Sequence, residues 1–357
     1  MHMNGRKVYA SGGGYRWSRV LGTESFLKNP CYSIMGGIDL KDKKILYHLD
    51  ENARYSLAQI GRNVGLSKNG VRYRTENLEE SGVIKHYYAV VDVYKLGYIA
   101  IKCHYAFQFT NPGVEKDIIQ FFVENPHTVV VASARGTYDL AVILLVKDIR
   151  EFYGLFLETQ EKFGYYFKEK TLAFFIHEKR YRPSFLLQDT GEPPDRAVTM
   201  TTGGGERQNV DDLDHELLRT ISNNARIPLT EIADAFDKSS SFVKYRLKNL
   251  MKSGVIRGFR IDLDVKKLGY QVFRVHLYLK QYNLRSDIIQ YVEQNPHLVF
   301  IDTYAGDADL DLQFYFEDMD HFYEAMQDVM EAFPEAISFY KYYSIMRYHK
   351  FLYFPDR

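Results

Sequence analysis

The sequence predicts an α+β fold in which a three-helix module, followed by a sheet-containing module, occurs twice. The chain has 357 residues, and its second half repeats motifs of its first half in the same order. In each repeat, apolar residues recur first at helical spacing and then alternate at strand spacing. A repeat of this length indicates tandem copies of one folding unit.

The duplication is visible when the stretch from Ile38 is aligned with the stretch from Val210. They align without a gap, at a shift of about 172 residues, as far as a KLGY motif in each copy. Roughly two dozen of about sixty positions are identical. Weaker similarity continues to Gly136–Asp139 and Gly306–Asp309. The chain is therefore an internal duplication.

The first half of each unit carries the signals of three short helices. In the first copy, Asp39 and Ser67 are suited to cap the first and third helices. A second helix is expected over Ser56–Val64, and Gly82 provides the left-handed residue that ends the third. The predicted wing strands are Val83–Ile84 and Tyr87–Val91. The second copy repeats these signals, so each copy is predicted to form a winged helix-turn-helix.

The outer face of each third helix carries side chains that can contact DNA. Arg, Lys, Asn and Ser read base edges or hold phosphates. The candidates are Ser67, Lys68, Asn69, Arg72, Tyr73 and Arg74 in the first copy, and Ser239, Ser240, Ser241, Lys244, Tyr245, Arg246 and Lys248 in the second. For Arg74 and Arg246, a structural ion pair that supports the wing is an equally good interpretation.

Charge separates the two candidate recognition helices. The first contains Glu76, Glu79 and Glu80, whereas Ser239–Lys252 contains no acidic residue. Each basic group near a phosphate adds a salt-sensitive increment of affinity. The second module is therefore expected to contribute more non-specific affinity. An alternative is that the first module is degenerate and only the second binds DNA.

The second half of each unit predicts the order βαββαβ, which is the ferredoxin-like split motif. Two helices would cover one face of its sheet, so the other face needs a partner sheet. In the first copy the expected elements are Tyr98–Phe109, Val114–Glu124, Thr128–Ala134, Tyr138–Val146, Ile149–Phe163 and Lys168–His177.

Composition excludes several classes of protein. A formal net charge of zero excludes a globally basic nucleic-acid binder but leaves room for a local basic face. The two cysteines, Cys31 and Cys103, form no CxxC pattern, which argues against a zinc site and fits a reducing cytoplasm. No apolar run approaches the roughly 18 residues of a membrane span. We therefore expect a cytoplasmic protein without metal, cofactor or membrane partner.

These motifs resemble the leucine-responsive/asparagine-regulator (Lrp/AsnC) family of prokaryotic transcription regulators. The resemblance rests on IDLKDKKIL, NARYSLAQIGRNVGLS, ESGVIKHYYAVVDVYKLGY and RGTYD, which occur in the family's order. It covers nearly all of residues 38–185 and 210–350. It implies a DNA-binding module followed by an ACT-like sensor module, which pairs with another through its sheet.

The resemblance also implies double-stranded DNA as a partner and an amino-acid effector near the Gly-x-x-Asp turn. The positions carried over are Gly136, Tyr138, Asp139, Gly306, Asp307 and Asp309. Ala308 stands where the first copy has Tyr138, so the two turns are not equivalent. An ordinary hairpin turn is the alternative interpretation. Since family members dimerise, one chain is expected to be a pseudo-dimer that forms homo-oligomers through its sensor modules.

The expected organisation has six segments. They are a basic N-terminal extension (1–37), the first winged helix-turn-helix (38–92) and sensor domain (93–187), a linker (188–209), and the second winged helix-turn-helix (210–264) and sensor domain (265–357). The linker is expected because Pro, Gly, Thr and charged residues cannot build a core.

An enzyme is the main competing interpretation. The siroheme decarboxylases resemble the same architecture, and a tetrapyrrole site would need His, Tyr and Arg around a cavity. The candidate histidines, His86, His104, His127, His177, His276 and His297, have no spacing that defines a site. No nucleophile constellation, catalytic carboxylate pair or phosphate loop is found. We therefore expect no catalytic activity.

Overall fold

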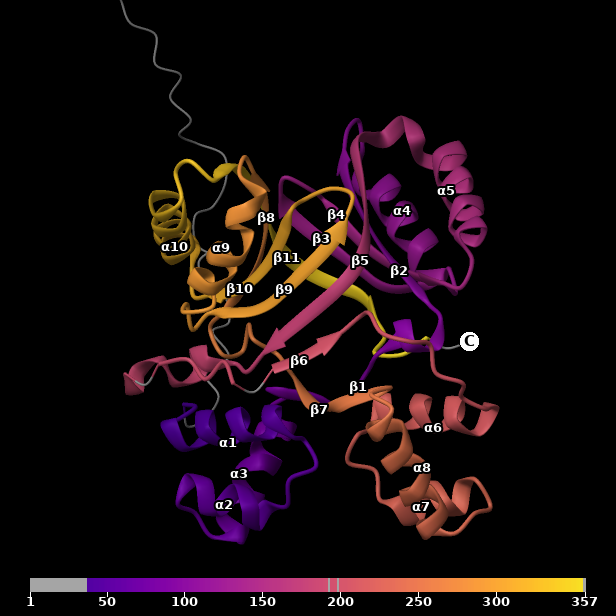
Figure 1. The fold of residues 1–357 in the computed structure, drawn as a ribbon, viewed down its shortest axis with the longest axis vertical. Coiled ribbons are helices and arrows are strands. Elements are labelled where there is room, and N and C mark those ends of the chain that lie inside the picture. The colour runs from indigo at the N-terminus through magenta and orange to yellow at the C-terminus, as the bar shows by residue number, and fades with distance from the viewer. Residues whose placement is uncertain (1–36, 192, 198, 356–357) are drawn as a thin grey trace, which may run out of the picture. The chain divides into compact units, whose positions relative to one another are not determined.

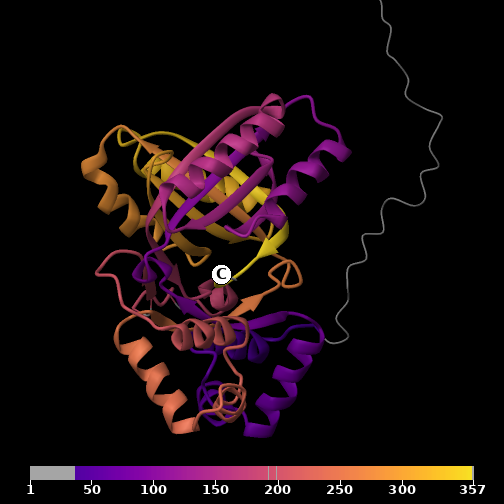
Figure 2. The ribbon, with the colours of Figure 1, turned by 90° about the vertical axis from the view of Figure 1, so that its right-hand side faces the viewer.

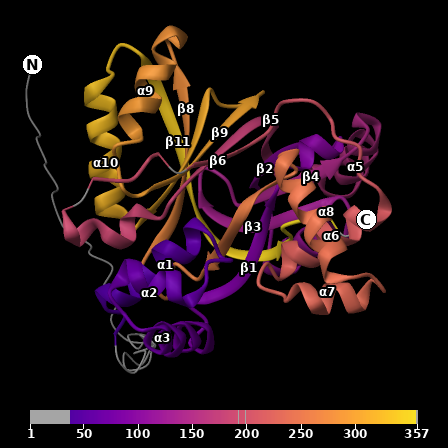
Figure 3. The same ribbon diagram turned by 60° about the horizontal axis from the view of Figure 1, so that its bottom comes forward.

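The computed structural model describes residues 37–191, 193–197 and 199–355. Apart from Gly37, the predicted basic extension lies outside these residues. Within the described part, two helix-turn-helix modules lie below one large sheet assembly (Figure 1), and Figure 2 shows the same arrangement from the side. Figure 3 brings the helical modules toward the viewer.

Each helix-turn-helix module contains three helices, and the caps predicted for the first and third are present. Asp39 accepts a hydrogen bond from the Asp42 amide, and Ser67 accepts one from Gly70. Gly82 has a φ of 68°, which explains why a glycine ends the third helix. The helices are α1 (Leu40–Glu51), α2 (Leu57–Val64) and α3 (Lys68–Glu80), then α6 (Asp212–Asn223), α7 (Leu229–Ala235) and α8 (Ser240–Lys252).

The strands after the recognition helices join the two copies. β1 (Ile84–Val91) pairs antiparallel with β7 (Ile256–Leu263), and the two form a separate two-stranded sheet, here called the ribbon. The prediction of two separate strands at Val83–Ile84 and Tyr87–Val91 was therefore wrong. A single strand forms because its hydrogen-bonding partner is the equivalent strand of the other copy.

The sheets of the two sensor modules join into one barrel. β11 (Ile337–Phe351) pairs with β3 (Thr128–Gly136), and β5 (Phe167–Tyr181) pairs with β9 (Leu298–Ala305). Because β2 (Ile99–Phe107) pairs with both β4 and β5, the ring closes. The remaining barrel strands are β4 (Leu140–Val146), β8 (Gln271–Leu279) and β10 (Leu310–Phe316). Closure leaves no free edge among the barrel strands.

Helices cover the outside of the barrel, and their packing decides which strand residues face inward. Ile101 and Cys103 of β2 belong to an apolar cluster with Ile118 and Phe122 of a covering helix. Since successive strand residues alternate in direction, Lys102 points into the barrel. The covering helices are α4 (Pro112–Glu124), α5 (Ile149–Phe163), α9 (Arg285–Val292) and α10 (Met319–Ala332).

Part of the predicted linker is structured. A short 3-10 segment covers Ser184–Thr190, and β6 (Thr199–Thr202) pairs with β5. This strand was not predicted, because its four residues, three threonines and Met200, show no clear periodicity. Among the described residues, no helix has the length and apolar character required to cross a membrane.

Candidate functional site

The two recognition helices, α3 and α8, present matched polar faces to solvent. Tyr73 and Tyr245 occupy equivalent positions and are 67% and 61% exposed. Ser240 is half-buried, whereas the other predicted contacts apart from the two arginines are exposed: Ser67, Lys68, Asn69 and Arg72, and Ser239, Ser241, Lys244 and Lys248. Ser67 and Ser239 also cap their helices through their side chains. Both helices thus display cationic, amide or hydroxyl groups beside one exposed tyrosine.

Arg74 and Arg246 are engaged in structural ion pairs. Arg74 Nη1 lies 2.9 Å from a carboxylate oxygen of Asp39 and 2.9 Å from one of Asp42. Arg246 Nη1 lies 2.7 Å from Asp211, the cap of α6. These arginines tie each recognition helix to the start of the first helix. We therefore correct their assignment from DNA contacts to supports of the module.

The ribbon holds the two helical modules by symmetric contacts. The Ala53 amide donates to the Phe259 carbonyl at 2.9 Å, and the equivalent Ala225 amide donates to Tyr87 at 2.7 Å. The Arg226 guanidinium lies 4.7 Å from the centre of the Tyr87 ring. Each module therefore rests on the strand that belongs to the other copy.

A buried ion pair anchors the first module only. Arg260 of β7 binds both carboxylate oxygens of Asp50 at the end of α1, and donates to the Tyr181 carbonyl at 2.6 Å. Arg260 and Asp50 are both buried. The equivalent positions of the other copy hold Tyr88 and Ser222, which cannot form an ion pair.

The Gly-x-x-Asp turns approach the last strand of the opposite copy. Gly136 has a φ of 130°, and a Cβ there would lie 2.7 Å from the Tyr342 carbonyl oxygen. A Cβ on Gly306 would lie 2.5 Å from the Leu172 carbonyl oxygen. Asp139 and Asp309 accept hydrogen bonds from strand amides, those of Phe107 and Leu279, both at 2.7 Å. These four predicted effector residues therefore have clear structural roles.

The other two predicted effector residues meet inside the molecule. Tyr138 is fully buried, and its ring stacks on His104 at 4.7 Å between centroids. Its hydroxyl lies 3.4 Å from Asp307, a weak hydrogen bond across the two copies. Asp307 also accepts a hydrogen bond from Tyr278 at 2.8 Å. The turns of the two copies thus contribute to one shared cluster.

That cluster continues into a buried charge network within the barrel. Lys102 Nζ lies 2.7 Å from Asp311, and Arg274 Nη2 lies 2.6 Å from Asp302. The Tyr304 hydroxyl lies 2.8 Å from Asp311 and 3.0 Å from Asp302. Both carboxylates come from the second copy, because the first copy has alanine at the equivalent positions. Two cations and two carboxylates therefore neutralise one another away from bulk water, and the Tyr304 hydroxyl bridges the carboxylates.

The equivalent histidines of the two copies lie in this network but differ in electrostatics. Burial lowers the pKa of His104 well below its usual value, and the nearby His276 adds to the effect. Burial also opposes the charged form of His276, but Asp311 and Asp307 outweigh it and raise the pKa of His276. Burial raises the pKa of Asp302 to about 6. This convergence was not predicted, although Lys102 and Arg274 each stand two residues before a histidine in an otherwise apolar strand.

One group within the described residues has the spacing of metal ligands. Side-chain atoms of His104, His276 and Asp307 all lie within 4.8 Å of one another. Lys102 and Arg274 belong to the same network, and their positive charges oppose a metal cation.

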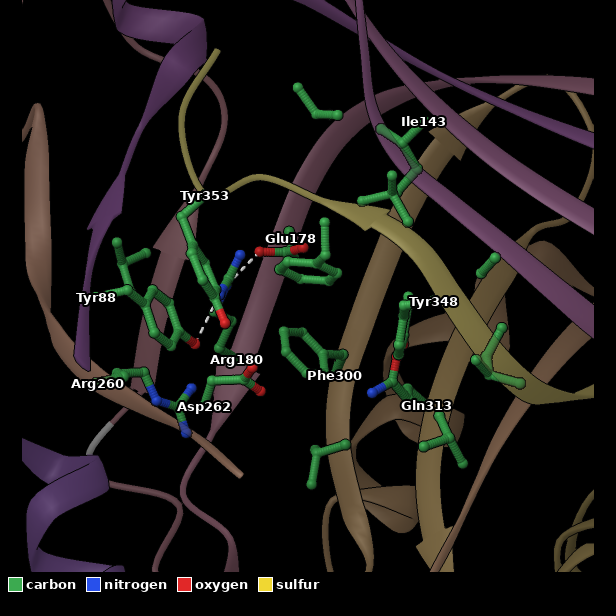
Figure 4. Close-up of a pocket in the computed structure, with 18 of the residues that line it drawn as sticks. Tyr88, Ile143, Glu178, Arg180, Arg260, Asp262, Phe300, Gln313, Tyr348 and Tyr353 are labelled. Atoms are coloured by element: carbon green, nitrogen blue, oxygen red, sulfur yellow. Dashed lines mark hydrogen bonds and ion pairs between the residues drawn. The ribbon is translucent and has the colours of Figure 1, made fainter. Parts of the chain in front are cut away.

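A cavity of about 530 Å³ lies between the ribbon and the barrel interior. Figure 4 shows Tyr88, Arg260 and Asp262 from the ribbon at one side, and Phe300, Gln313 and Tyr348 from the barrel at the other. The charge network reaches the cavity through Lys102, Arg274 and Asp302. No described histidine lines it. The sequence could not predict this cavity, because its walls come from both copies.

Comparison with known proteins identifies the repeated unit. The winged helix-turn-helix DNA-binding family matches residues 38–85 and 210–257. The HTH-type transcriptional regulator Rv2324 of Mycobacterium tuberculosis is 35% identical over 122 residues, covering 32% of this chain and 78% of the relative. The HTH-type transcriptional regulator LrpA of Pyrococcus abyssi is 30% identical over 113 residues, covering 28% and 79%.

A solved structure matches the tandem arrangement. The crystal structure of the siroheme decarboxylase NirDL covers 88% of this chain and 94% of its own, with a TM-score of 0.60 and 12% identity. At that identity the likeness concerns the fold, and it confirms two helix-turn-helix regions followed by α/β modules. With two matched DNA-binding segments and regulators as sequence relatives, the chain belongs to the Lrp/AsnC family and carries the family's unit twice.

Proposed function

We propose that this protein is a non-enzymatic transcription regulator that binds double-stranded DNA through α3 and α8. The observation that carries the proposal is the matched pair of capped helices, each with an exposed tyrosine between exposed cationic or amide groups. Side chains of these types hold phosphates and read base edges in the major groove. The regulators among the sequence relatives support the same role.

The two modules are proposed to address adjacent half-sites of one operator. Half-sites one helical turn apart have centres roughly 34 Å apart. The exposed residues of α3 and α8 differ, so the preferred operator is an imperfect palindrome. Lys244 and Lys248 have no acidic neighbours on α8, whereas α3 carries Glu76. The second module therefore supplies more of the salt-dependent affinity.

DNA selection followed by anisotropy titration tests this proposal. We expect one enriched, asymmetric two-part site. Replacing Lys244 and Lys248 by alanine should weaken binding about tenfold or more and reduce the salt slope by about two. Lys116→Ala, an exposed lysine on α4, is the matched control and should leave affinity unchanged.

A second pair of variants tests the contribution of the first module. Lys68→Ala with Arg72→Ala should weaken binding by a smaller factor than the α8 pair. If this variant binds DNA with unchanged affinity, only the second module binds DNA. Failure to enrich any DNA sequence would overturn the proposed function.

A tetrapyrrole enzyme is the second candidate, favoured by the NirDL-like fold together with the large cavity. The lining disfavours a polycarboxylate ligand, because most of its cations already have carboxylate partners. These pairs are Lys85–Asp262, Lys102–Asp311, Arg180–Glu178, Arg260–Asp50 and Arg274–Asp302. Titration with siroheme, followed by its absorption spectrum and product analysis, separates this candidate from the first.

A further inference from the structure

We infer that the cavity between the ribbon and the barrel is a binding site for a flat aromatic molecule with one anionic group and one hydrogen-bond donor. We further infer that its occupancy alters how the two helix-turn-helix modules are held. This second half of the inference rests on the proposed DNA binding, whereas the first half does not. The site is distinct from the Gly-x-x-Asp turns, whose aspartates are held by strand amides.

The size and the walls of the cavity favour an aromatic ligand. Its volume of about 530 Å³ lies within the range of small-molecule sites, roughly 300–1,000 Å³. Tyr88 and Tyr353 stack at 4.0 Å with 18° between their planes, presenting a flat aromatic surface at one side. Tyr348 lines the opposite side, and the Arg180 guanidinium lies over the Phe300 ring, 5.2 Å from its centre (Figure 4). Offset stacking between such rings suits a planar ligand.

Polar atoms at the cavity that lack a hydrogen-bond partner indicate which functional groups the ligand carries. Arg180 donates from Nε to Glu178 and from Nη1 to the Tyr88 hydroxyl, and its Nη2 makes no hydrogen bond to the described residues. The buried Tyr353 hydroxyl makes no hydrogen bond of 3.5 Å or less to them, and the Asp262 carboxylate is near enough to contribute to the raised pKa of Tyr353. Figure 4 shows both residues at the ribbon side of the cavity. A guanidinium nitrogen beside a hydroxyl is suited to an anionic oxygen.

The barrel side of the cavity presents a hydrogen-bond acceptor, so the ligand should carry a hydrogen-bond donor there. Asp302 lines the cavity, and its Oδ1 is buried without a hydrogen-bond partner, while Oδ2 is taken by Arg274. An unpaired buried acceptor is unfavourable, so a ligand N–H or O–H that reaches it gains affinity. Arg180 and Asp302 come from the paired strands β5 and β9, two residues apart in register, so the anion and the donor belong close together on the ligand.

Arg260 links the cavity to the first DNA-binding module. It lines the cavity and at the same time binds Asp50 of α1 and the Tyr181 carbonyl of β5. The ribbon strands, which line the cavity, also accept hydrogen bonds from the backbone amides of Ala53 and Ala225 in the two modules. If the modules shift, the ribbon shifts with them, so a ligand that contacts the ribbon has a different affinity for each arrangement of the modules. Such a difference in affinity between two arrangements is what allosteric control requires.

The test uses the full chain and 8-anilinonaphthalene-1-sulfonate, an aromatic probe with one sulfonate and one N–H. We expect saturable fluorescence with one probe molecule per chain. Arg180→Met should weaken binding about tenfold, the equivalent of one charged hydrogen bond. Ala132→Leu, which fills the cavity from β3, should abolish it. Lys179→Met, the neighbouring residue on the opposite face of β5, is the matched control and should bind like the unaltered chain.

The outcomes separate the two halves of the inference. Binding that both Arg180→Met and Ala132→Leu leave unchanged would overturn the site, and thermal melts establish that each variant is folded. Siroheme displacing the probe would overturn the ligand class. With the site established, the operator affinity should change at least about fivefold on saturation, the lower end of the usual allosteric range. An unchanged operator affinity would overturn the regulatory half, and a chain that selects no DNA would refute the proposed function while leaving the probe result intact.

Discussion

The two helix-turn-helix modules share one fold but are attached to the barrel in different ways. Both donate an alanine amide to the ribbon, yet only the first has the buried Asp50–Arg260 pair. Arg182 adds a second anchor, donating to Glu51 at 2.9 Å, with its guanidinium 3.7 Å from the Tyr47 ring centre. The second module has serine in place of Asp50 and the more basic recognition helix. Duplication has allowed one copy to specialise in anchoring and the other in charge.

The barrel interior shows the same division of roles. Strands of the second copy supply Asp302 and Asp311, where the first copy has Ala132 and Ala141. The cations come from both copies, at the equivalent positions Lys102 and Arg274, and both pair with carboxylates of the second copy. A symmetric dimer would place two copies of each charge in the barrel interior, whereas here only the cations are present twice.

Breaking the anchor should produce the largest difference between the modules. Asp50→Ala leaves the buried Arg260 charge without its carboxylate, and we expect a loss of about 3–5 kcal/mol in the free energy of unfolding. Ser222→Ala, the equivalent change in the second copy, should cost less than about 1 kcal/mol. Urea titrations measure both. Equal losses would show that the two modules are attached with the same strength.

The anchor can also be replaced rather than broken. Asp50→Leu combined with Arg260→Met removes both charges while keeping apolar volume, so most of the stability should return.

The paired histidines should respond to pH in opposite directions. Because the pKa of His276 is raised, its stabilising contribution is full below the ordinary histidine pKa and is lost as pH rises through the folded pKa. His276→Gln should therefore lower the unfolding free energy by about 1.5–3 kcal/mol near pH 6 and by less near pH 9. Chemical denaturation at several pH values gives the profile.

His104→Gln is the matched comparison from the first copy. The pKa of His104 is lowered, so the folded protein loses stability as pH falls through the ordinary histidine pKa. Removing this group should lessen the acid-side loss. The same slope in both variants would contradict the electrostatic difference between the copies.

The helix caps should show the smallest effect and no difference between the copies. Ser67 accepts from the Gly70 amide at 3.1 Å, and Ser239 accepts from Phe242 at 3.2 Å. Replacing either by alanine should lower stability by about 1 kcal/mol. Unequal losses, measured by thermal unfolding, would sharpen the comparison by placing an asymmetry within the modules themselves.

Local signals predicted much of this fold, whereas contacts between distant segments did not follow from them. Asp39, Ser67 and Gly82 act within a few residues of their own positions, so their capping roles were readable from the sequence. The ribbon was not, because β1 finds its partner about 170 residues away in β7. Arg74 illustrates the same limit. Its exposure on α3 depends on whether Asp39 and Asp42 are within reach, which only the packing of α1 decides.

The candidate site also combines residues that the sequence predicts with residues that it does not. The recognition-helix residues follow from helical periodicity, which places them opposite the apolar face. The cavity needs both ribbon strands and both halves of the barrel, and no single segment contains its pattern. Lys102 and His104 could be placed on one face of a strand, but their partners Asp311 and Tyr343 come from the other copy.

The ribbon affects how operator occupancy would depend on the amount of this protein in a cell. Pairing of β1 with β7 takes place within one polypeptide, so the two modules meet at the high effective concentration of a tethered system, on the order of millimolar. A regulator assembled from separate subunits must first pass a dimerisation equilibrium, and its active form falls with the square of subunit number when the protein is scarce. A tandem chain avoids that step, so operator occupancy would scale linearly with gene dosage even at a few molecules per cell.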